Sequence, residues 1–342
     1  MFTDSTVLIT GGGGSVGRAL ISRFLDEGVG VVRVFDNNEP SLSKLAAGFD
    51  DDRLRYLVGD IRDKERLKRA MKDIDIVVHT AAMKHVDICE YNPFEAVQTN
   101  AVGLQNVVDT AIDADVRRVV FTSSDKAVNP ANTMGTTKLL GEKLVTAGNK
   151  YAGDPNIRFA SVRLGNVINS SQSVIPLFKE QIREEGAVTL TDPRMTRFFL
   201  TYDDVADLVT SAVEKTKGGE IFVHKMPAVE IEDLAEALIR VFAPEYGYDP
   251  EDIEIEVVGR RLGETFHEEI MTERETLRTV ENESLYAVLP ETAEGRGYLS
   301  HDGLNGFSEA ESVTRSTAQA ETLSRSGIKS FLMDNDITEG SS

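Results

Sequence analysis

Residues 6–17 read TVLITGGGGSVG, and this stretch decides the fold. The apolar and β-branched run Thr6–Thr10 is typical of a buried strand, and the glycines after it indicate a tight turn. The segment Arg18–Glu27 then has the pattern of an amphipathic helix. A strand, a glycine-rich turn and a helix in this order predict the start of a βαβ unit, and hence a parallel sheet.

The same alternation continues through the first half of the chain. Further apolar runs predict strands at Val31–Phe35, Leu54–Val58, Ile74–His79, Arg118–Thr122 and Ile157–Arg163. Helical segments separate these runs, so right-handed crossovers would cover both faces of the sheet. We therefore expect an α/β fold with a Rossmann-like, doubly wound parallel sheet over residues 1–165.

The pattern loosens after Gly165. Helical pieces interleaved with short strands lie at 175–185, 203–215 and 231–242. They predict a smaller, discontinuous α/β region over 166–294, which binds substrate beyond the carboxyl ends of the strands. Ser, Thr, Glu and Gly prevail over 295–342, where we expect a loose tail with one terminal helix at 323–332.

Bulk composition narrows the function classes. The chain has 342 residues, with 57 Asp and Glu against 37 Lys and Arg and a net charge of −20. Such an acidic surface repels nucleic acid and anionic lipid, and solubility in a salty cytoplasm explains it most simply. No apolar run is long enough to span a membrane and no signal peptide is found, so we expect a cytoplasmic protein without membrane insertion. The single cysteine, Cys89, excludes an internal disulfide, and no residue cluster predicts a metal site.

The glycine-rich turn carries the first chemical signal. Gly11, Gly14 and Gly17 have a G-x-x-G-x-x-G spacing, which lets the backbone approach a pyrophosphate at the start of a helix. A structural turn alone would show the same glycines, so the surrounding residues decide. The turn residues expected to contact a dinucleotide are Gly11, Gly13, Gly14, Ser15, Val16 and Gly17.

Residues that follow the next strands support a dinucleotide. Asp36 ends the second strand, where a carboxylate can bond the ribose hydroxyls. It favours NAD, whereas Asn37 and the nearby Arg62 are compatible with the 2′-phosphate of NADP, so both cofactors stay open. Further cofactor contacts are expected after the third and fourth strands, at Asp60, Ile61, Ala81 and Ala82.

With these motifs the sequence resembles the extended short-chain dehydrogenase/reductase superfamily. Asn100, in the run QTNAVG, matches its mid-helix Asn-x-x-Gly signature and is expected at the cofactor. In most of the superfamily a tyrosine at the position of Met134 acts as acid and base on a hydroxyl carbon. This chain departs from that pattern, because methionine cannot transfer a proton.

The most specific run is SDKAVNP over residues 124–130, followed by MGTTK over 134–138. Together with AMKHV over 82–86, these residues resemble the polysaccharide-biosynthesis branch of the superfamily. That branch contains UDP-N-acetylglucosamine 4,6-dehydratases, some of which carry methionine in place of the tyrosine. Ser124, Asp125 and Lys126 would project from the end of the fifth strand, and Lys138 lies one helical turn after Met134.

The resemblance implies a reaction in which NAD or NADP is recycled within each turnover. A hydride leaves C4 of the sugar, a base removes the C5 proton, an acid protonates the departing C6 hydroxyl, and the hydride returns to C6. Lys126 would be the base if its pKa fell well below ~10.4, and Asp125 the acid if burial raised its pKa. Lys138 would bond the nicotinamide ribose, while Ser124, Lys126 or an ordered water would take the C4 hydroxyl proton.

Substrate contacts are expected mainly in the second half of the chain. Asn166 and Arg197 lie in the branch-like runs RLGNV and MTRFF, and Arg261 lies in GRRLGETFHE. Guanidinium forks suit a diphosphate, because they bond two oxygens at once. Lys84 is expected at the cofactor or the substrate. The other residues expected at a UDP-sugar are His85, Val174, Pro176 and Glu264.

Two alternatives compete with a dehydratase. An NAD-dependent UDP-hexosamine epimerase or oxidoreductase would share the fold but would normally need the missing tyrosine. A non-catalytic dinucleotide sensor would have no use for Asp125, Lys126 and Lys138 together. The resemblance also implies a homo-oligomer, whereas the sugar epimer and the configuration at C5 stay open.

Overall fold

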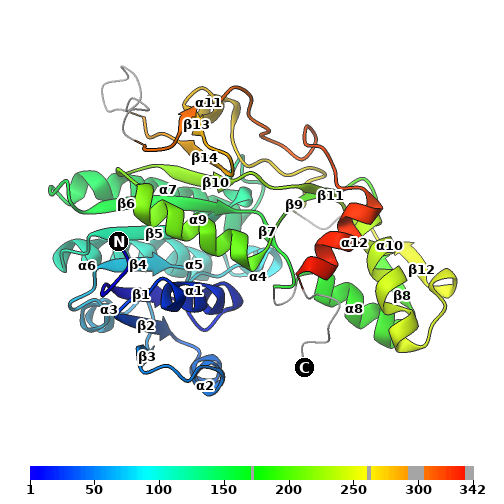
Figure 1. Ribbon diagram of the computed structural model, residues 1–342, viewed down its shortest axis with the longest axis horizontal. Coiled ribbons are helices and arrows are strands. Elements are labelled where there is room, and N and C mark those ends of the chain that lie inside the picture. The colour runs from blue at the N-terminus through cyan, green and yellow to red at the C-terminus, as the bar shows by residue number, and fades with distance from the viewer. Residues whose placement is uncertain (171–172, 260–262, 292–303, 336–342) are drawn as a thin grey trace. The chain divides into compact units, whose positions relative to one another are not determined.

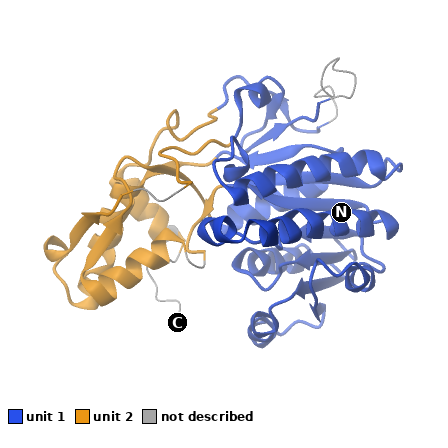
Figure 2. Cartoon of the chain, turned by 180° about the vertical axis from the view of Figure 1, so that it is seen from behind, with its two compact units in different colours: residues 1–164, 202–225, 271–313 blue, residues 165–201, 226–270, 314–342 orange. Residues whose placement is uncertain are grey.

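The computed structural model describes residues 1–170, 173–259, 263–291 and 304–335. The chain forms two compact units, which Figure 2 colours separately. Unit 1 comprises 1–164, 202–225 and 271–313, and unit 2 comprises 165–201, 226–270 and 314–342. The expected boundary after Gly165 lies beside the first crossing into unit 2, but the chain then returns to unit 1 twice.

Unit 1 is built on a ten-stranded sheet with the order β15-β13-β14-β10-β6-β5-β4-β1-β2-β3 (Figure 1). The parallel strands are β1 (Thr6–Thr10), β2 (Val31–Asp36), β3 (Leu54–Val58), β4 (Ile76–His79), β5 (Arg118–Ser124), β6 (Arg158–Leu164) and β10 (Ile221–His224). An antiparallel edge adds β14 (Leu285–Val288), β13 (Thr279–Glu281) and β15 (Ser308–Glu309). The strand order reverses between β1 and β4, which confirms the doubly wound fold and marks the edge where ligands bind in such sheets.

Helices cover both faces of this sheet. The helical segments of unit 1 are α1 (Ser15–Asp26), α2 (Glu39–Gly48), α3 (Lys64–Ala70), α4 (Val86–Tyr91), α5 (Pro93–Val97), η1 (Gln98–Gly103), α6 (Leu104–Asp113), η2 (Asp125–Ala127), α7 (Thr133–Tyr151), α9 (Tyr202–Lys215) and α11 (Glu273–Thr276). Helix α1 packs beside α9, whereas α6 packs between α3 and α7 (Figure 1). Leu8, Val77 and Phe121 belong to one buried cluster with residues of α6, so the core of unit 1 lies between the sheet and its helices.

Element boundaries differ from the sequence expectation for local reasons. Helix α1 begins at Ser15 rather than Arg18, because Gly14 takes the extended conformation of an N-cap (φ −78°, ψ 169°). Strand β4 begins at Ile76 rather than Ile74, and the preceding Asp75 accepts a hydrogen bond from the Thr6 amide at 2.8 Å.

Unit 2 is a smaller α/β body. Its elements are β7 (Asn166–Val167), α8 (Val174–Glu185), β8 (Ala187–Leu190), β9 (Thr196–Leu200), β11 (Ala228–Glu230), α10 (Ile231–Phe242), η3 (Pro244–Tyr246), η4 (Pro250–Asp252), β12 (Glu254–Val257) and α12 (Arg325–Asp334). The strands form two small sheets, β11-β9-β7 and β12-β8. Helix α12 corresponds to the terminal helix expected at 323–332, shifted by two residues. The Ser324 hydroxyl caps its start. Within the described ranges, no helix has the length and apolarity needed to cross a membrane.

Candidate functional site at the strand ends of unit 1

Close packing shapes the turn between β1 and α1. Gly11 has φ +71°, and a Cβ atom there would lie 2.5 Å from the Ala81 amide nitrogen. A Cβ atom at Gly17 would lie 2.5 Å from the Cα atom of Gly12. Gly14 caps α1 without a side chain, and the first helical turn, which Ser15 and Val16 begin, holds no acidic residue. The amides at this helix start are therefore suited to an anion such as a pyrophosphate.

Asp36 lies beside this turn at the end of β2. Its Oδ2 accepts a hydrogen bond from the Gly13 amide at 3.0 Å, and its Oδ1 accepts one from the Asn38 amide at 2.9 Å. These bonds fix the carboxylate, and each of its oxygens retains a lone pair. The arrangement fits a carboxylate that accepts hydrogen bonds from two ribose hydroxyls.

Arg62, which the sequence left as a candidate for a 2′-phosphate, binds acidic residues instead. Its Nε and Nη2 reach Asp60 at 3.1 and 2.7 Å, and its Nη1 reaches Glu95 at 3.2 Å. The hydrogen bond from Arg62 is the main reason that the pKa of Asp60 is lowered, and Asn37 also bonds this carboxylate. Ile61, between Asp60 and Arg62, is buried.

Asn100 holds the segment after β4 in place. It is buried in η1, a π-helix, where its Oδ1 accepts a hydrogen bond from the Met83 amide at 2.8 Å. Its Nδ2 donates to the Met83 carbonyl at 3.0 Å and to Thr137 Oγ1 at 2.9 Å. Asn100 thus joins the segment of Ala81 and Ala82 to α7, and its expected contact with the cofactor stays a prediction. Exposed Lys84 and half-buried His85 follow Met83, and His85 is the N-cap residue of α4.

Three polar residues form a bonded group at the end of β5. Lys126 Nζ lies 3.1 Å from Asp125 Oδ1 and 3.2 Å from Oδ2, and the Ser124 hydroxyl donates to Asp125 Oδ1 at 2.6 Å. The Asp125 side chain is 1% exposed, whereas that of Lys126 is 32% exposed. A buried carboxylate thus supports an amine that remains accessible, as expected for a proton-transfer site.

Lys138 projects from α7 to the same strand. Its Nζ donates to the Thr122 carbonyl at 2.8 Å and lies 4.8 Å from the centre of the Phe121 ring. Burial lowers the pKa of Lys138 to about 8, although Glu142 and Cys89 oppose the shift. The amine is therefore held at the strand end in a poorly hydrated environment.

Met134 is buried at the start of α7, four residues before Lys138. It packs with Cys89 and Ala96, and half-buried Met83 and Val86 cover the same cluster. The Asn132 side chain accepts a hydrogen bond from the Gly135 amide and fixes the helix start. A thioether fills the space near Lys138, so acid–base chemistry depends on other residues.

The expected UDP contacts of unit 2 meet at a glutamate that the sequence analysis missed. Asn166 Nδ2 donates to Glu268 Oε2 at 2.8 Å, and Arg197 Nε lies 3.3 Å from Glu268 Oε1. Arg197 also donates to the carbonyls of Thr196 and Phe266. The place of Glu268 at the end of the branch-like run GRRLGETFHE was an available signal. The role of Asn166 and Arg197 at a diphosphate stays a prediction.

Other expected substrate residues are less informative. Val174 and Pro176 lie in the first turn of α8. Glu264 is half-buried in the segment between β12 and α11, whereas Arg261 lies outside the described residues. Their assignment to a ligand stays a prediction.

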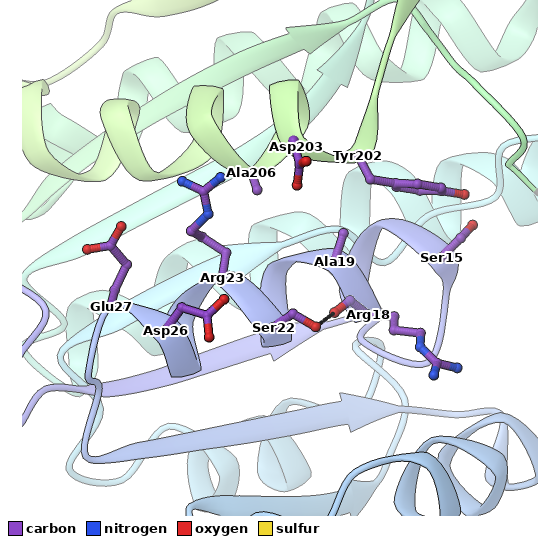
Figure 3. A pocket seen from close by; sticks show the side chains of 10 residues that line it. All are labelled: Ser15, Arg18, Ala19, Ser22, Arg23, Asp26, Glu27, Tyr202, Asp203 and Ala206. Carbon is purple, nitrogen blue, oxygen red and sulfur yellow. Dashed lines mark hydrogen bonds between the residues drawn. The ribbon is translucent and has the colours of Figure 1, made fainter. Parts of the chain in front are cut away.

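A surface pocket of about 780 Å³ lies along α1 and α9 (Figure 3). Arg18, Arg23 and Tyr202 are among its lining residues, and Arg23 pairs with Asp207. Burial raises the pKa of Tyr202, which also bonds Ser15. Among the residues expected at the cofactor only Ser15 lines it, so this pocket is distinct from the strand-end site.

The parallel sheet, the glycine turn and the strand-end lysines define the class of the short-chain dehydrogenases/reductases. The chain belongs to the polysaccharide biosynthesis protein family, whose model matches residues 7–290. Its relatives make it an enzyme of the nucleotide-sugar dehydratase and epimerase group.

Two relatives differ in the activity that they are named for. A UDP-N-acetylglucosamine 4,6-dehydratase (inverting) of Campylobacter jejuni is 41% identical over 293 residues, which cover 85% of this chain and 84% of the relative. A UDP-glucose 4-epimerase of Rickettsia felis is 39% identical over 279 residues, which cover 80% of each chain.

Solved structures confirm the fold. Pen from Bacillus thuringiensis superposes with a TM-score of 0.90 at 39% identity and covers 98% of this chain and 99% of its own. A dTDP-glucose 4,6-dehydratase from Streptomyces venezuelae, solved with NAD bound, has a TM-score of 0.66 at 25% identity and covers 76% of this chain and 86% of its own.

Proposed function

We propose that this chain is a nucleotide-sugar 4,6-dehydratase that converts UDP-N-acetylglucosamine into a UDP-4-keto-6-deoxy-N-acetylhexosamine. The observation that carries the proposal is the bonded group of Ser124, Asp125 and Lys126 at the end of β5. The dehydratase relative supports the same reaction. Met134 supports elimination over tyrosine-dependent chemistry, because its side chain cannot exchange a proton.

The Asp125–Lys126 pair can supply both an acid and a base. As an ion pair it holds one proton on Nζ, which lies 3.1 Å from Oδ1. Transfer of that proton to Asp125 would leave a neutral amine and a neutral carboxyl group, so the pair must be treated as one titrating system. Exclusion of water by a bound sugar would favour this neutral form, since charges are costly in a dry site.

Each residue then has a defined task. A nicotinamide dinucleotide held by the glycine turn and Asp36 would supply the hydride chemistry, as acceptor at C4 and then as donor at C6. Neutral Lys126 takes the C5 proton, and Asp125 donates its proton to the departing C6 hydroxyl. A proton returns to C5 when the hydride reaches C6. Ser124, Lys126 or an ordered water would take the C4 hydroxyl proton. Protonated Lys138 would bond the nicotinamide ribose and would keep a positive charge near these groups.

We infer that NAD is the preferred cofactor. The Asp36 carboxylate is fixed at the end of β2 by the amides of Gly13 and Asn38. A 2′-phosphate placed there would be repelled, because both groups are anionic. Arg62 is paired with Asp60 and Glu95, so neutralising such a phosphate would require breaking existing ion pairs.

The proposal is tested by mass spectrometry of UDP-N-acetylglucosamine incubated with the enzyme at high salt. We expect a product lighter by one water molecule. Lys126→Ala should abolish elimination while the Kd for NAD stays within about twofold, since the dinucleotide residues lie elsewhere. Lys143→Ala, an exposed lysine on α7, is the matched control and should retain turnover.

Other products would identify the competing functions. An epimer of unchanged mass would replace the proposal with the activity for which the Rickettsia relative is named. Tight NAD binding without turnover of any UDP-hexosamine would favour a sensor. Wild-type turnover by Lys126→Ala would show that the assigned base is wrong.

A further inference from the structure

A buried group of three charged residues lies within unit 1, and the proposed reaction does not use it. Arg163 lies on β6, one residue before its end, Glu142 lies on α7 and Glu275 lies on α11. Their side chains are 2%, 1% and 8% exposed. Burial of three charges is costly unless their geometry is well matched, so the arrangement calls for a role.

The geometry of this triad is well matched. The Arg163 guanidinium donates to both Glu142 oxygens from Nε and Nη2, each at 2.8 Å. It also donates to both Glu275 oxygens, from Nη1 at 2.9 Å and from Nη2 at 2.8 Å. Although burial alone would raise it, hydrogen bonds from Arg163 help to lower the pKa of Glu275 to about 2. Two bidentate contacts on one planar cation fix the three elements firmly.

Glu142 connects the triad to the residues that carry the chemistry. It lies four residues after Lys138, one helical turn further along α7. Its Oε1 also accepts a hydrogen bond from the Ser123 hydroxyl at 2.7 Å, and Ser123 directly precedes Ser124 and Asp125 on β5. The neighbouring Thr122 carbonyl accepts the bond from Lys138. Helix α7 is therefore bonded to the end of β5 at two consecutive residues.

From this juxtaposition we propose that Glu142, held by Arg163 and Glu275, is a positioning residue that sets Lys138 against the Ser124–Lys126 group. The inference rests on the proposed function for its catalytic consequence. Misplacement of about 1 Å between reacting groups can cost on the order of a hundredfold in rate. Loss of the triad should therefore lower kcat more than it weakens binding.

The triad also acts on Lys138 through its charge. The titratable groups coupled electrostatically to the Lys138 amine come from three elements: His79 on β4, Cys89 on α4 and Glu142 on α7. The Thr122 carbonyl and the Phe121 ring on β5 also contact the amine. Glu142 is the member of this set whose negative charge favours the protonated amine most. Removing that charge lowers the pKa of Lys138 further. If loss of the Lys138 proton sets the basic limb of the kcat profile, that limb then moves to lower pH.

The first experiment compares Ser123→Ala and Glu142→Gln with matched controls. The controls are Ser161→Ala, whose buried hydroxyl has no hydrogen-bond partner among the described residues, and Glu220→Gln, a buried glutamate remote from α7 in sequence that bonds Thr216. We expect both test variants to lower kcat about tenfold or more, with KM and the Kd for NAD within about twofold. Only Glu142→Gln should move the basic limb to lower pH.

The second experiment does not depend on turnover. The folding equilibria of wild type, Glu142→Gln, Lys138→Met and the double variant are measured at pH 7 and pH 9.5. At pH 7, where Lys138 is charged, this double-mutant cycle should show a coupling between Glu142 and Lys138 on the order of tenfold in the folding equilibrium constant. At pH 9.5 it should show no coupling. If this coupling is found but the enzyme shows no turnover, the positioning role of the triad is supported and the proposed dehydratase function is not.

Three results would overturn the proposal, and the third concerns the control variants. One is equal coupling at both pH values, which would show a contact that does not depend on the Lys138 charge. Another is wild-type kcat in Ser123→Ala, which tests the bond to β5 even if Glu142→Gln does not fold. Effects of the same size in the control variants would likewise reduce the triad to a general structural role.

Discussion

The variant Lys138→Met tests whether burial of the charged Lys138 amine at the strand-end site lowers the free energy of unfolding. Burial lowers the pKa of Lys138 from 10.5 to about 8. Between these two values the unfolded chain binds more protons than the folded chain, so the free energy of unfolding rises with pH across this window. Methionine has a similar length but no titrating group. The variant therefore lacks this pH-dependent contribution to the free energy of unfolding.

The magnitude follows from the two pKa values. From pH 7 to pH 9.5, titration of Lys138 should stabilise the wild type relative to Lys138→Met by about 2 kcal/mol. Most of this change, about four fifths, should appear above pH 8. Because the comparison is a difference between two proteins, other titrating groups cancel if both fold alike.

Urea unfolding at fixed high salt, repeated between pH 7 and pH 9.5, measures this difference. Lys143→Met removes an exposed lysine from the same helix and controls for the loss of one positive charge from α7. If the difference in unfolding free energy between wild type and Lys138→Met stays constant within about 0.5 kcal/mol from pH 7 to pH 9.5, titration of Lys138 does not have the expected effect on stability. The amine would then not be held in a desolvated environment.

Four further predictions follow from described residues. Acidification from pH 7 to pH 5 should destabilise the wild type by about 2 kcal/mol relative to His79→Gln in urea unfolding. Burial, with a smaller contribution from Lys138, lowers the pKa of His79 from 6.5 to about 3, so across this range the unfolded chain takes up a proton that the folded chain does not. Asp36→Ala should narrow the preference for NAD over NADP by about tenfold or more in calorimetric titration, and an unchanged ratio would remove Asp36 as the selector. Gly11→Ala should destabilise the fold by about 2 kcal/mol or more and weaken NAD binding, because its φ is +71° and a Cβ atom would meet the Ala81 segment; a normal melting temperature would contradict this packing. Tyr91→Ser with Phe94→Ser should reduce the molar mass in light scattering, because these side chains are 88% and 68% exposed on α4 and α5, and an unchanged oligomer would place the interface elsewhere.

Local sequence patterns predicted the fold of unit 1 well because each signal is contained within one short segment. The strand β1, the glycine turn and the start of α1 are adjacent in the chain, and the turn glycines have geometry that few other residues tolerate. The return of 202–225 and 271–313 to unit 1 was not predicted. Those segments pair with distant strands, as β10 does with β6, and their sequences carry no local mark of the partner.

The candidate site shows the same division. Ser124, Asp125 and Lys126 were predicted from one run at the end of one strand, and the structure brings them into hydrogen-bond contact. Glu142 and Glu275 were missed because they meet Arg163 across 21 and 112 residues of sequence. The spacing of Glu142 from Lys138 was a usable signal, since both lie on one buried face of α7.

The most direct test of the central claim is to follow the C4 hydrogen of the sugar. UDP-N-acetylglucosamine carrying deuterium at C4 is incubated with the enzyme in light water, and the product is analysed by NMR and mass spectrometry. We expect a product that has lost water and carries the deuterium at C6. Deuterium retained at C4 in a sugar of unchanged mass, or label lost to solvent, would contradict this expectation.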